Sequence, residues 1–269
     1  MIGSTERVSG KRRFDTALLT LTESLSMNRP ALRAATSLFL LFGILSSAAW
    51  SHYLWVGLDP KSGEHGTVNV YYEGGPGPGD GQYLDRFIKS GKTWIRTLDA
   101  DSPAGLKMKE TKSPGKRWLS APLTSGGPRS IESYGKFGVY RYGKTDVLLH
   151  YYAKHFDVSS LDELMKLGRA EQLHLDIVPQ LVDDGAGFQV LWKGKPVADR
   201  PVAVRGPGGF NAKLTTDEKG HVHFEPKGKG RYTLRTSVEQ NETGTDDGEE
   251  FQLIRHHGTA LINLPIQKK

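Results

Sequence analysis

The sequence predicts an all-β fold of two β-sandwich-like modules, preceded by a signal peptide or a single N-terminal membrane helix. Two observations support the β assignment. Short runs of β-branched and aromatic residues alternate with turns rich in Gly and Pro along most of the chain. After residue 185, at least six such runs follow within about 80 residues, which is the spacing of a small β-sandwich.

Residues 27–51 have the features of a secretory signal peptide. Two arginines form a positively charged n-region, and residues 37–45 (SLFLLFGIL) form an apolar h-region. Small residues then allow cleavage before Trp50 or before His52. The second cut would make His52 the first residue of the mature protein.

Residues 1–26 are polar and precede this signal, which normally starts a chain. We therefore expect translation to start at Met27, with 1–26 an over-extended start. The alternative is an uncleaved membrane anchor at 34–50, with 1–26 as its basic cytoplasmic tail. Both interpretations place the rest of the chain in the periplasm or otherwise outside the cytoplasm, with membrane contact only through the N-terminal segment.

Composition limits the chemistry of the exported part. The whole chain carries a formal charge of +6, but the part after residue 51 has 30 basic and 27 acidic residues. This small excess is not clustered on a motif, so no nucleic-acid partner is expected. The chain has no cysteine, which excludes disulfides and thiolate metal sites. A metal would need His, Asp, Glu or the terminal amine as ligands.

The N-terminal module is predicted to span 52–184. Within it, 137–142 and 147–153 are predicted strands joined by a Gly-containing turn. One helix is expected at 159–169, where Ser160 begins a capping box and leucines form an apolar face.

The C-terminal module is predicted to span 185–269 as an Ig-like or prealbumin-like sandwich. Its segment 192–236 (WKGKPVADRPVAV…TTDEKGHVHFEPKGKGRYTLRT) resembles the carboxypeptidase-regulatory-like β-sandwich, a common non-catalytic module of exported proteins. Together with 52–56 (HYLWV), 134–154 and 173–180 (LHLDIVPQ), it makes the exported chain similar to the domain-of-unknown-function 4198 family. That resemblance implies a periplasmic protein associated with nickel or cobalt uptake, and hence a membrane metal transporter as partner.

Three histidines are the predicted metal ligands. If His52 is the mature N-terminus, its amine and imidazole form a chelate suited to Ni(II) or Cu(II), and the resemblance adds Co(II). A further histidine, His150 or His257, is expected to complete the ligand set. His150 lies in a strand pattern, where a hydrogen-bonded structural role is the alternative.

His221, His223 and Glu225 form a second possible ligand row, because residues two apart in a strand share a face. Val222 and Phe224 alternate with them and are typical core residues. The row is therefore expected to face solvent.

No catalytic motif is present: the chain has no nucleophile elbow, HExxH or phosphate-binding loop. We therefore expect a non-enzymatic protein that binds or delivers a divalent transition metal. The alternative is a structural or adhesive module of the cell envelope that binds protein or glycan. The whole chain has 15 Tyr and Trp residues; core packing explains most of them, and aromatic platforms for a carbohydrate are the other role open to them.

Overall fold

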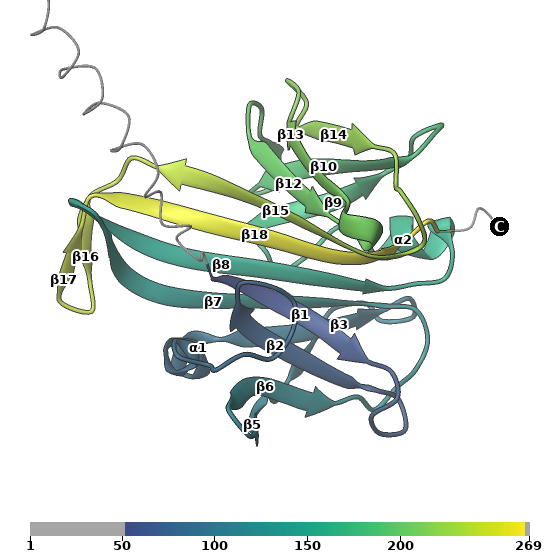
Figure 1. Cartoon of the computed structure of the whole chain (residues 1–269), viewed down its shortest axis with the longest axis horizontal. Helices are drawn as coiled ribbons and strands as arrows, with labels where there is room; N and C mark the ends of the chain where they lie inside the picture. The colour runs from purple at the N-terminus through teal and green to yellow at the C-terminus, as the bar shows by residue number, and fades with distance from the viewer. Residues whose placement is uncertain (1–51, 267–269) are drawn as a thin grey trace, which may run out of the picture. The chain divides into compact units, whose positions relative to one another are not determined.

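The computed structural model describes residues 52–266, which form a predominantly β-stranded structure (Figure 1). The predicted all-β class is confirmed. The predicted signal peptide at 27–51, the alternative anchor at 34–50 and the polar segment 1–26 lie outside the described residues. Within the described residues, no helix is long and apolar enough to cross a bilayer.

A central sheet of eight strands organises the fold, in the order β13-β12-β15-β18-β8-β7-β3-β4. Neighbouring strands are antiparallel except β18 and β8, which are parallel. In sheet order the strands are β13 (Asn211–Thr215), β12 (Pro201–Arg205), β15 (Gly230–Gln240), β18 (Leu253–Leu264), β8 (Thr145–Asp157), β7 (Arg129–Tyr142), β3 (Lys92–Thr97) and β4 (Ala104–Leu106).

Two smaller sheets pack against the central sheet, and each is named here by its place in the sequence. The N-terminal outer sheet consists of β1 (Tyr53–Asp59), β2 (Thr67–Glu73), β6 (Lys116–Pro122) and β5 (Lys109–Ser113). The C-terminal outer sheet consists of β9 (Leu175–Gln180), β10 (Ala186–Trp192), β11 (Lys195–Pro196) and β14 (His221–Phe224). The remaining elements are the helices α1 (Leu84–Ser90) and α2 (Leu161–Leu167), the 3₁₀ turn η1 (Pro207–Gly209) and the hairpin β16 (Gly244–Asp246) and β17 (Glu249–Phe251).

Alternate residues of β8 serve two hydrophobic cores. Leu149 and Tyr151 belong to the core beneath the N-terminal outer sheet. Tyr152 and Phe156 belong to the core beneath the C-terminal outer sheet. Because successive side chains of a strand point to opposite faces, the two outer sheets cover opposite faces of the central sheet. The fold is thus two sandwiches that share one sheet (Figure 1).

The predicted boundary between residues 184 and 185 falls inside the C-terminal sandwich. β9 precedes it in sequence but pairs with β10 along six residues. Tyr152 and Phe156 also precede it and lie in the C-terminal core. The described residues belong to one compact unit. Local sequence patterns reveal strands in each half, but strand partners distant in sequence join the halves.

Local signals specify α2 and one tight turn. Ser160 Oγ accepts a hydrogen bond from the Glu163 amide, and Glu163 Oε2 accepts one from the Ser160 amide, which confirms the capping box. The turn at 217–220 places Gly220 at φ 75°, a conformation that disfavours other residues. The helix α1 was not predicted, and its Leu84 and Phe87 are buried in the N-terminal core.

A buried ion pair fixes the segment that connects α2 to β9. Lys154 on β8 is 2% exposed and Asp176 on β9 is 4% exposed. The Lys154 ammonium donates to an Asp176 carboxylate oxygen and to the Gly168 carbonyl, and the other Asp176 oxygen accepts from the Ala170 amide. Removing one partner would leave a buried charge unpaired, which typically costs about 3–5 kcal/mol.

We predict that a fragment of residues 185–269 does not fold cooperatively. It lacks β8, which pairs with β18 from Leu253 to Leu261, and it lacks β9. The exposed edge and the missing core residues leave too little buried surface for a stable sandwich. Thermal circular dichroism should show no sharp transition for the fragment and one transition for residues 52–269. A cooperative melt of the fragment would contradict the shared-sheet description.

Candidate functional site

A cleft of about 360 Å³ opens on the face of the central sheet that carries the C-terminal core. We call it the histidine–aromatic cleft. Five central strands (β3, β7, β8, β18 and β15) contribute to it, together with the segment before β9 and the end of β10. Its lining residues are Lys92, Trp94, Tyr134, His150, Tyr152, Gln172, His174, Trp192, Lys193, Gln240 and His256.

Strand register explains why these side chains meet. Lys92 pairs with Tyr134, and Tyr134 pairs with Tyr152, which places one row of side chains across β3, β7 and β8. In a neighbouring row, His150 of β8 pairs with His256 of β18. Paired residues of adjacent strands point to the same face, so the floor of the cleft follows directly from the sheet register.

The paired histidines are stacked and hydrogen-bonded. The His150 and His256 rings are 5.1 Å apart at 25°. His256 Nε2 lies 2.8 Å from Gln240 Oε1, and its Nδ1 lies 3.3 Å from the Tyr152 hydroxyl. Since the amide oxygen accepts, His256 Nε2 carries the proton and Nδ1 accepts from Tyr152. Both nitrogens of a neutral imidazole are thereby satisfied.

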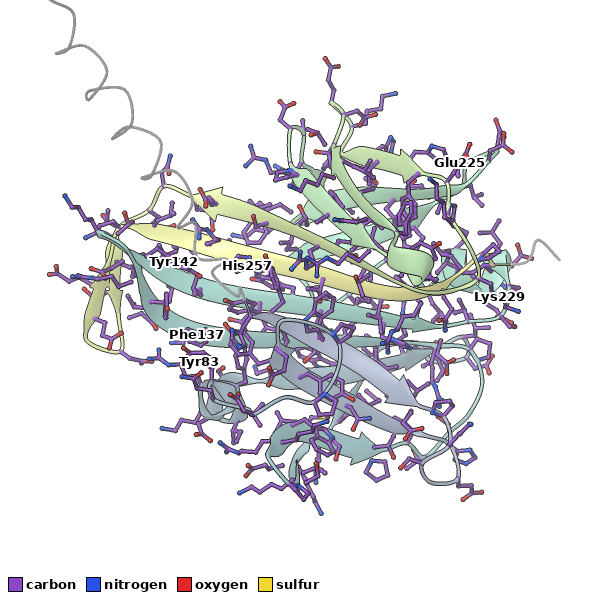
Figure 2. All side chains as sticks on the ribbon, viewed as in Figure 1. Tyr83, Phe137, Tyr142, Glu225, Lys229 and His257 are labelled. Carbon is purple, nitrogen blue, oxygen red and sulfur yellow. The ribbon has the colours of Figure 1, made fainter. Side chains whose placement is uncertain are left out.

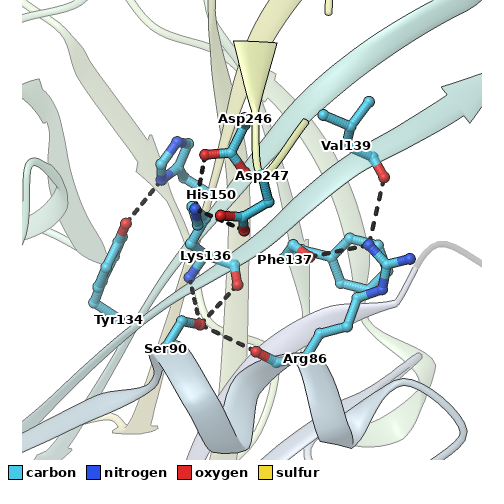
Figure 3. Close-up of polar contacts among 9 residues, drawn as sticks. All are labelled: Arg86, Ser90, Tyr134, Lys136, Phe137, Val139, His150, Asp246 and Asp247. Atoms are coloured by element: carbon cyan, nitrogen blue, oxygen red, sulfur yellow. Dashed lines mark hydrogen bonds and ion pairs between the residues drawn. The ribbon is translucent and has the colours of Figure 1, made fainter. Parts of the chain in front are cut away.

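His150 is hydrogen-bonded through one of its two ring nitrogens. Its Nδ1 is 2.8 Å from the Tyr134 hydroxyl (Figure 3). No described residue is hydrogen-bonded to its Nε2, so this nitrogen is available to a ligand. The ring is half-buried, and Tyr134 fixes its orientation.

Aromatic rings enclose the histidines. The Trp192 ring is 4.1 Å from the His256 ring, and the exposed His174 ring stands perpendicular to Trp192 at 6.0 Å. Tyr152 meets Trp192 edge to face at 6.3 Å. Trp94 and Trp192 are each half-buried, so part of each indole faces the cleft.

His150 and His256, the two histidines on the floor of the cleft, are neutral near pH 7. Burial lowers the pKa of His150 to about 4. Burial, assisted by the neighbouring His150, lowers the pKa of His256 to about 3. The lining contains two lysines, Lys92 and Lys193, and no Asp or Glu. The cleft therefore combines aromatic faces and uncharged polar groups with a positive rim.

A charged cluster lies beside the cleft where β7 bulges. Lys136, the partner of His150 across β7 and β8, binds Asp246 at 2.7 Å and Asp247 at 3.3 Å (Figure 3). These contacts hold the β16–β17 hairpin against β7. At the bulge, Arg86 of α1 donates to the carbonyls of Phe137 and Val139, while Ser90 donates to the Lys136 carbonyl.

The predicted ligand His257 lies on the face of the central sheet that carries the N-terminal core, opposite the cleft. It follows His256 in β18 and therefore points away from the cleft. Its ring stacks on Tyr151 at 4.9 Å and meets the edge of Tyr53 at 5.3 Å. It is 6% exposed, and both ring nitrogens lack hydrogen-bond partners among the described residues. His150 and His257 thus cannot share an ion.

His52, the third predicted ligand, lies at the start of the N-terminal outer sheet. Its ring stacks on Tyr72 at 5.6 Å and meets Tyr83 edge to face at 5.3 Å. Its Nε2 is 4.0 Å from a Glu73 carboxylate oxygen. Within residues 52–266, no group of three or more His, Asp or Glu residues is arranged to hold a metal. The three predicted ligands do not form one site.

The row of His221, His223 and Glu225 faces outward, as expected. Val222 and Phe224 are buried in the C-terminal core, while His223 and Glu225 are exposed. Figure 2 labels Glu225, just after the end of β14. The row thus lies on the solvent side of β14.

Sequence reasoning missed His256 and Trp192 as site residues. Of the pair His256–His257, it favoured the residue that faces the opposite core. The alternation along β18 is the pattern that could have identified His256. Ile254 and Ile262 lie an even number of residues from His256 and therefore share its face of the sheet. Ile262 lies in the C-terminal core with Tyr152. That signal becomes decisive only once β18 is known to pair with β8.

Comparisons with known proteins do not assign the chain to a family. No protein-family model and no curated protein matches it. Among solved structures, the BSP domain of a biofilm-associated protein is 9% identical, over 77% of this chain and 51% of that chain, with a TM-score of 0.19. This chain spans about half the length of that domain, and a TM-score this low supports no argument. The resemblance to the 4198 family stays a prediction.

We predict that the free energy of unfolding falls as the pH drops from about 6.5 towards 3. His155 and His257 are buried, and burial lowers their pKa values to about 4 and about 3. Burial likewise lowers the pKa values of His150 and His256, to about 4 and about 3. In the unfolded chain these imidazoles take up protons near pH 6.5, whereas in the folded protein they stay neutral down to their lowered pKa values. Each histidine therefore lowers the free energy of unfolding by ~1.4 kcal/mol per pH unit in that window.

Urea unfolding between pH 7.5 and 4.5 measures this effect. Replacing His257 by Phe, which keeps the ring stack on Tyr151, should make the dependence shallower. The matched control Tyr71→Phe removes no imidazole and should leave the slope unchanged, because the pKa of Tyr71 is raised above its usual value of about 10 by burial. Equal slopes for the wild type and His257→Phe would contradict the prediction.

Proposed function

We propose that the protein is an exported, non-enzymatic module of the cell envelope that binds a saccharide in the histidine–aromatic cleft. The observation that carries this proposal is the convergence of indole and phenol rings with neutral polar groups in one open cleft. The volume of about 360 Å³ lies within the range of small-molecule sites, roughly 300–1,000 Å³.

The chemistry of the lining suits a sugar ring. A pyranose has apolar C–H faces that pack on aromatic rings, and Trp94 and Trp192 offer partly exposed indoles. Its hydroxyl groups both donate and accept hydrogen bonds. Gln172 offers an exposed amide, and His150 offers a free Nε2 on a neutral ring.

The lining favours binding over hydrolysis. Most glycosidases use a pair of Asp or Glu residues that flank the scissile bond. The cleft presents no carboxylate among its lining residues. Both ring nitrogens of His256 and Nδ1 of His150 are already hydrogen-bonded to Tyr152, Gln240 and Tyr134. These features support a non-enzymatic role.

Export rests on the predicted signal at 27–51. Mass spectrometry of the mature N-terminus would test it, with a start at Trp50 or His52 as the expected result.

A transition-metal carrier is the second candidate, which would serve a membrane metal transporter. It is favoured by one observation: His150, His174 and His256 line the same cleft, and His150 and His256 are neutral, as metal ligation requires. Ni(II), Co(II) or Cu(II) would then engage His150 Nε2 and His174. A chelate at His52 would be a separate site and would require cleavage before that residue.

We predict that Trp94→Ala weakens binding of the preferred saccharide about tenfold, which corresponds to ~1.4 kcal/mol. The substitution removes one aromatic face from the cleft. An array of bacterial and plant oligosaccharides would identify the ligand, and calorimetry would measure affinity. Trp118→Ala is the matched control, since Trp118 is also half-buried but lies on β6 of the N-terminal outer sheet.

A nickel titration of the same samples separates the two candidates. Saccharide binding that His150→Ala and Trp94→Ala weaken, without tight Ni(II) binding, supports the proposed function. Tight Ni(II) binding lost in His150→Ala, with no saccharide bound, would replace it by the metal carrier.

A further inference from the structure

The formally charged residues that line the cleft are all positive. Its two formally charged lining residues are Lys92 on β3 and Lys193 after β10. Neither ammonium lies within 4.0 Å of a carboxylate in residues 52–266, whereas Lys136 and Lys154 are both paired. Both cleft lysines are exposed. Two unneutralised cations therefore flank a lining without acidic residues.

The backbone holds Lys193 at the rim. Lys193 has φ 50°, and Gly194 follows at φ 77°, so both occupy the left-handed region in the tight turn between β10 and β11. The Lys193 amide donates to the His174 carbonyl at 2.6 Å, which fixes the turn to the segment before β9. Its ammonium lies 5.2 Å from the centre of the Trp192 ring. This cation–π contact keeps the charge over the aromatic wall.

Lys92 is positioned from the other side of the cleft by sheet register. It pairs with Tyr134, whose hydroxyl holds His150. Its carbonyl accepts a hydrogen bond from Ser133 Oγ at 3.3 Å, which fixes the backbone of β3 to β7. The two lysines therefore come from separate elements, with the aromatic and imidazole groups of the floor between them.

We propose that the cleft selects an acidic oligosaccharide, whose carboxylates bind the Lys92 and Lys193 ammonium groups while its sugar rings pack on the aromatic lining between them. This inference rests on the proposed function and specifies its ligand class. A neutral sugar would leave both cations without a counter-ion, whereas a uronic-acid carboxylate supplies one beside the aromatic face. The neutral His150 ring adds a hydrogen-bonding group without further charge.

Calorimetry with tetragalacturonate and its methyl ester tests the selectivity, because esterification removes the charge and keeps the rings. A wider panel of matched acidic and neutral oligosaccharides extends the test. The wild type should bind the acidic member of a pair at least about tenfold more tightly, and added salt should reduce this advantage. The double variant Lys92→Gln/Lys193→Gln should bind the acid no better than the ester.

The matched control is Lys213→Gln, an exposed lysine on the edge strand β13, which should keep the full preference. Thermal melting should show that all variants are folded. Equal affinity of the wild type for acid and ester, or an undiminished preference in the double variant, would overturn the selectivity while leaving saccharide binding intact. Failure of every saccharide, acidic or neutral, to bind would overturn the proposed function as well.

Discussion

The parallel pairing of β8 with β18 is the constraint on which the rest of the structure depends. It joins strands about a hundred residues apart and makes one sheet from the halves of the chain. The pairing sets His150 against His256 and continues the row of Tyr134 and Tyr152 to Gly258. A side chain at Gly258 would approach Leu175 of β9 at 3.0 Å, so a small residue lets the outer sheet pack closely there.

Alternation along β18 places two neighbouring histidines on opposite faces of the central sheet. His256 faces the cleft and is fully hydrogen-bonded, whereas His257 faces the opposite core with both nitrogens unpartnered. Both are neutral near pH 7 because burial lowers their pKa values. In the cleft, the neutral His256 ring is hydrogen-bonded to Tyr152 and Gln240. In the core, His257 is a packed ring that makes the fold sensitive to acid.

The sequence alone predicted the structural features that depend on residues close together along the chain. The all-β class, the hairpin of β7 and β8 and the capping box at Ser160 follow from local patterns. It could not predict which distant strands pair, and so it placed a boundary at 185 and favoured His257 over His256. The buried pair of Lys154 and Asp176 was missed for the same reason, since each looks like an ordinary polar strand residue until its partner is known.

Native-state hydrogen exchange tests the shared sheet most directly, because it reports the opening free energy of each backbone amide. Amides of β8 and β18 within the paired stretch should exchange with one common free energy, equal to that of global unfolding. The slowest amides of both hydrophobic cores should share it. Two distinct free energies, one for each sandwich, with early opening of the β8–β18 hydrogen bonds, would contradict the account.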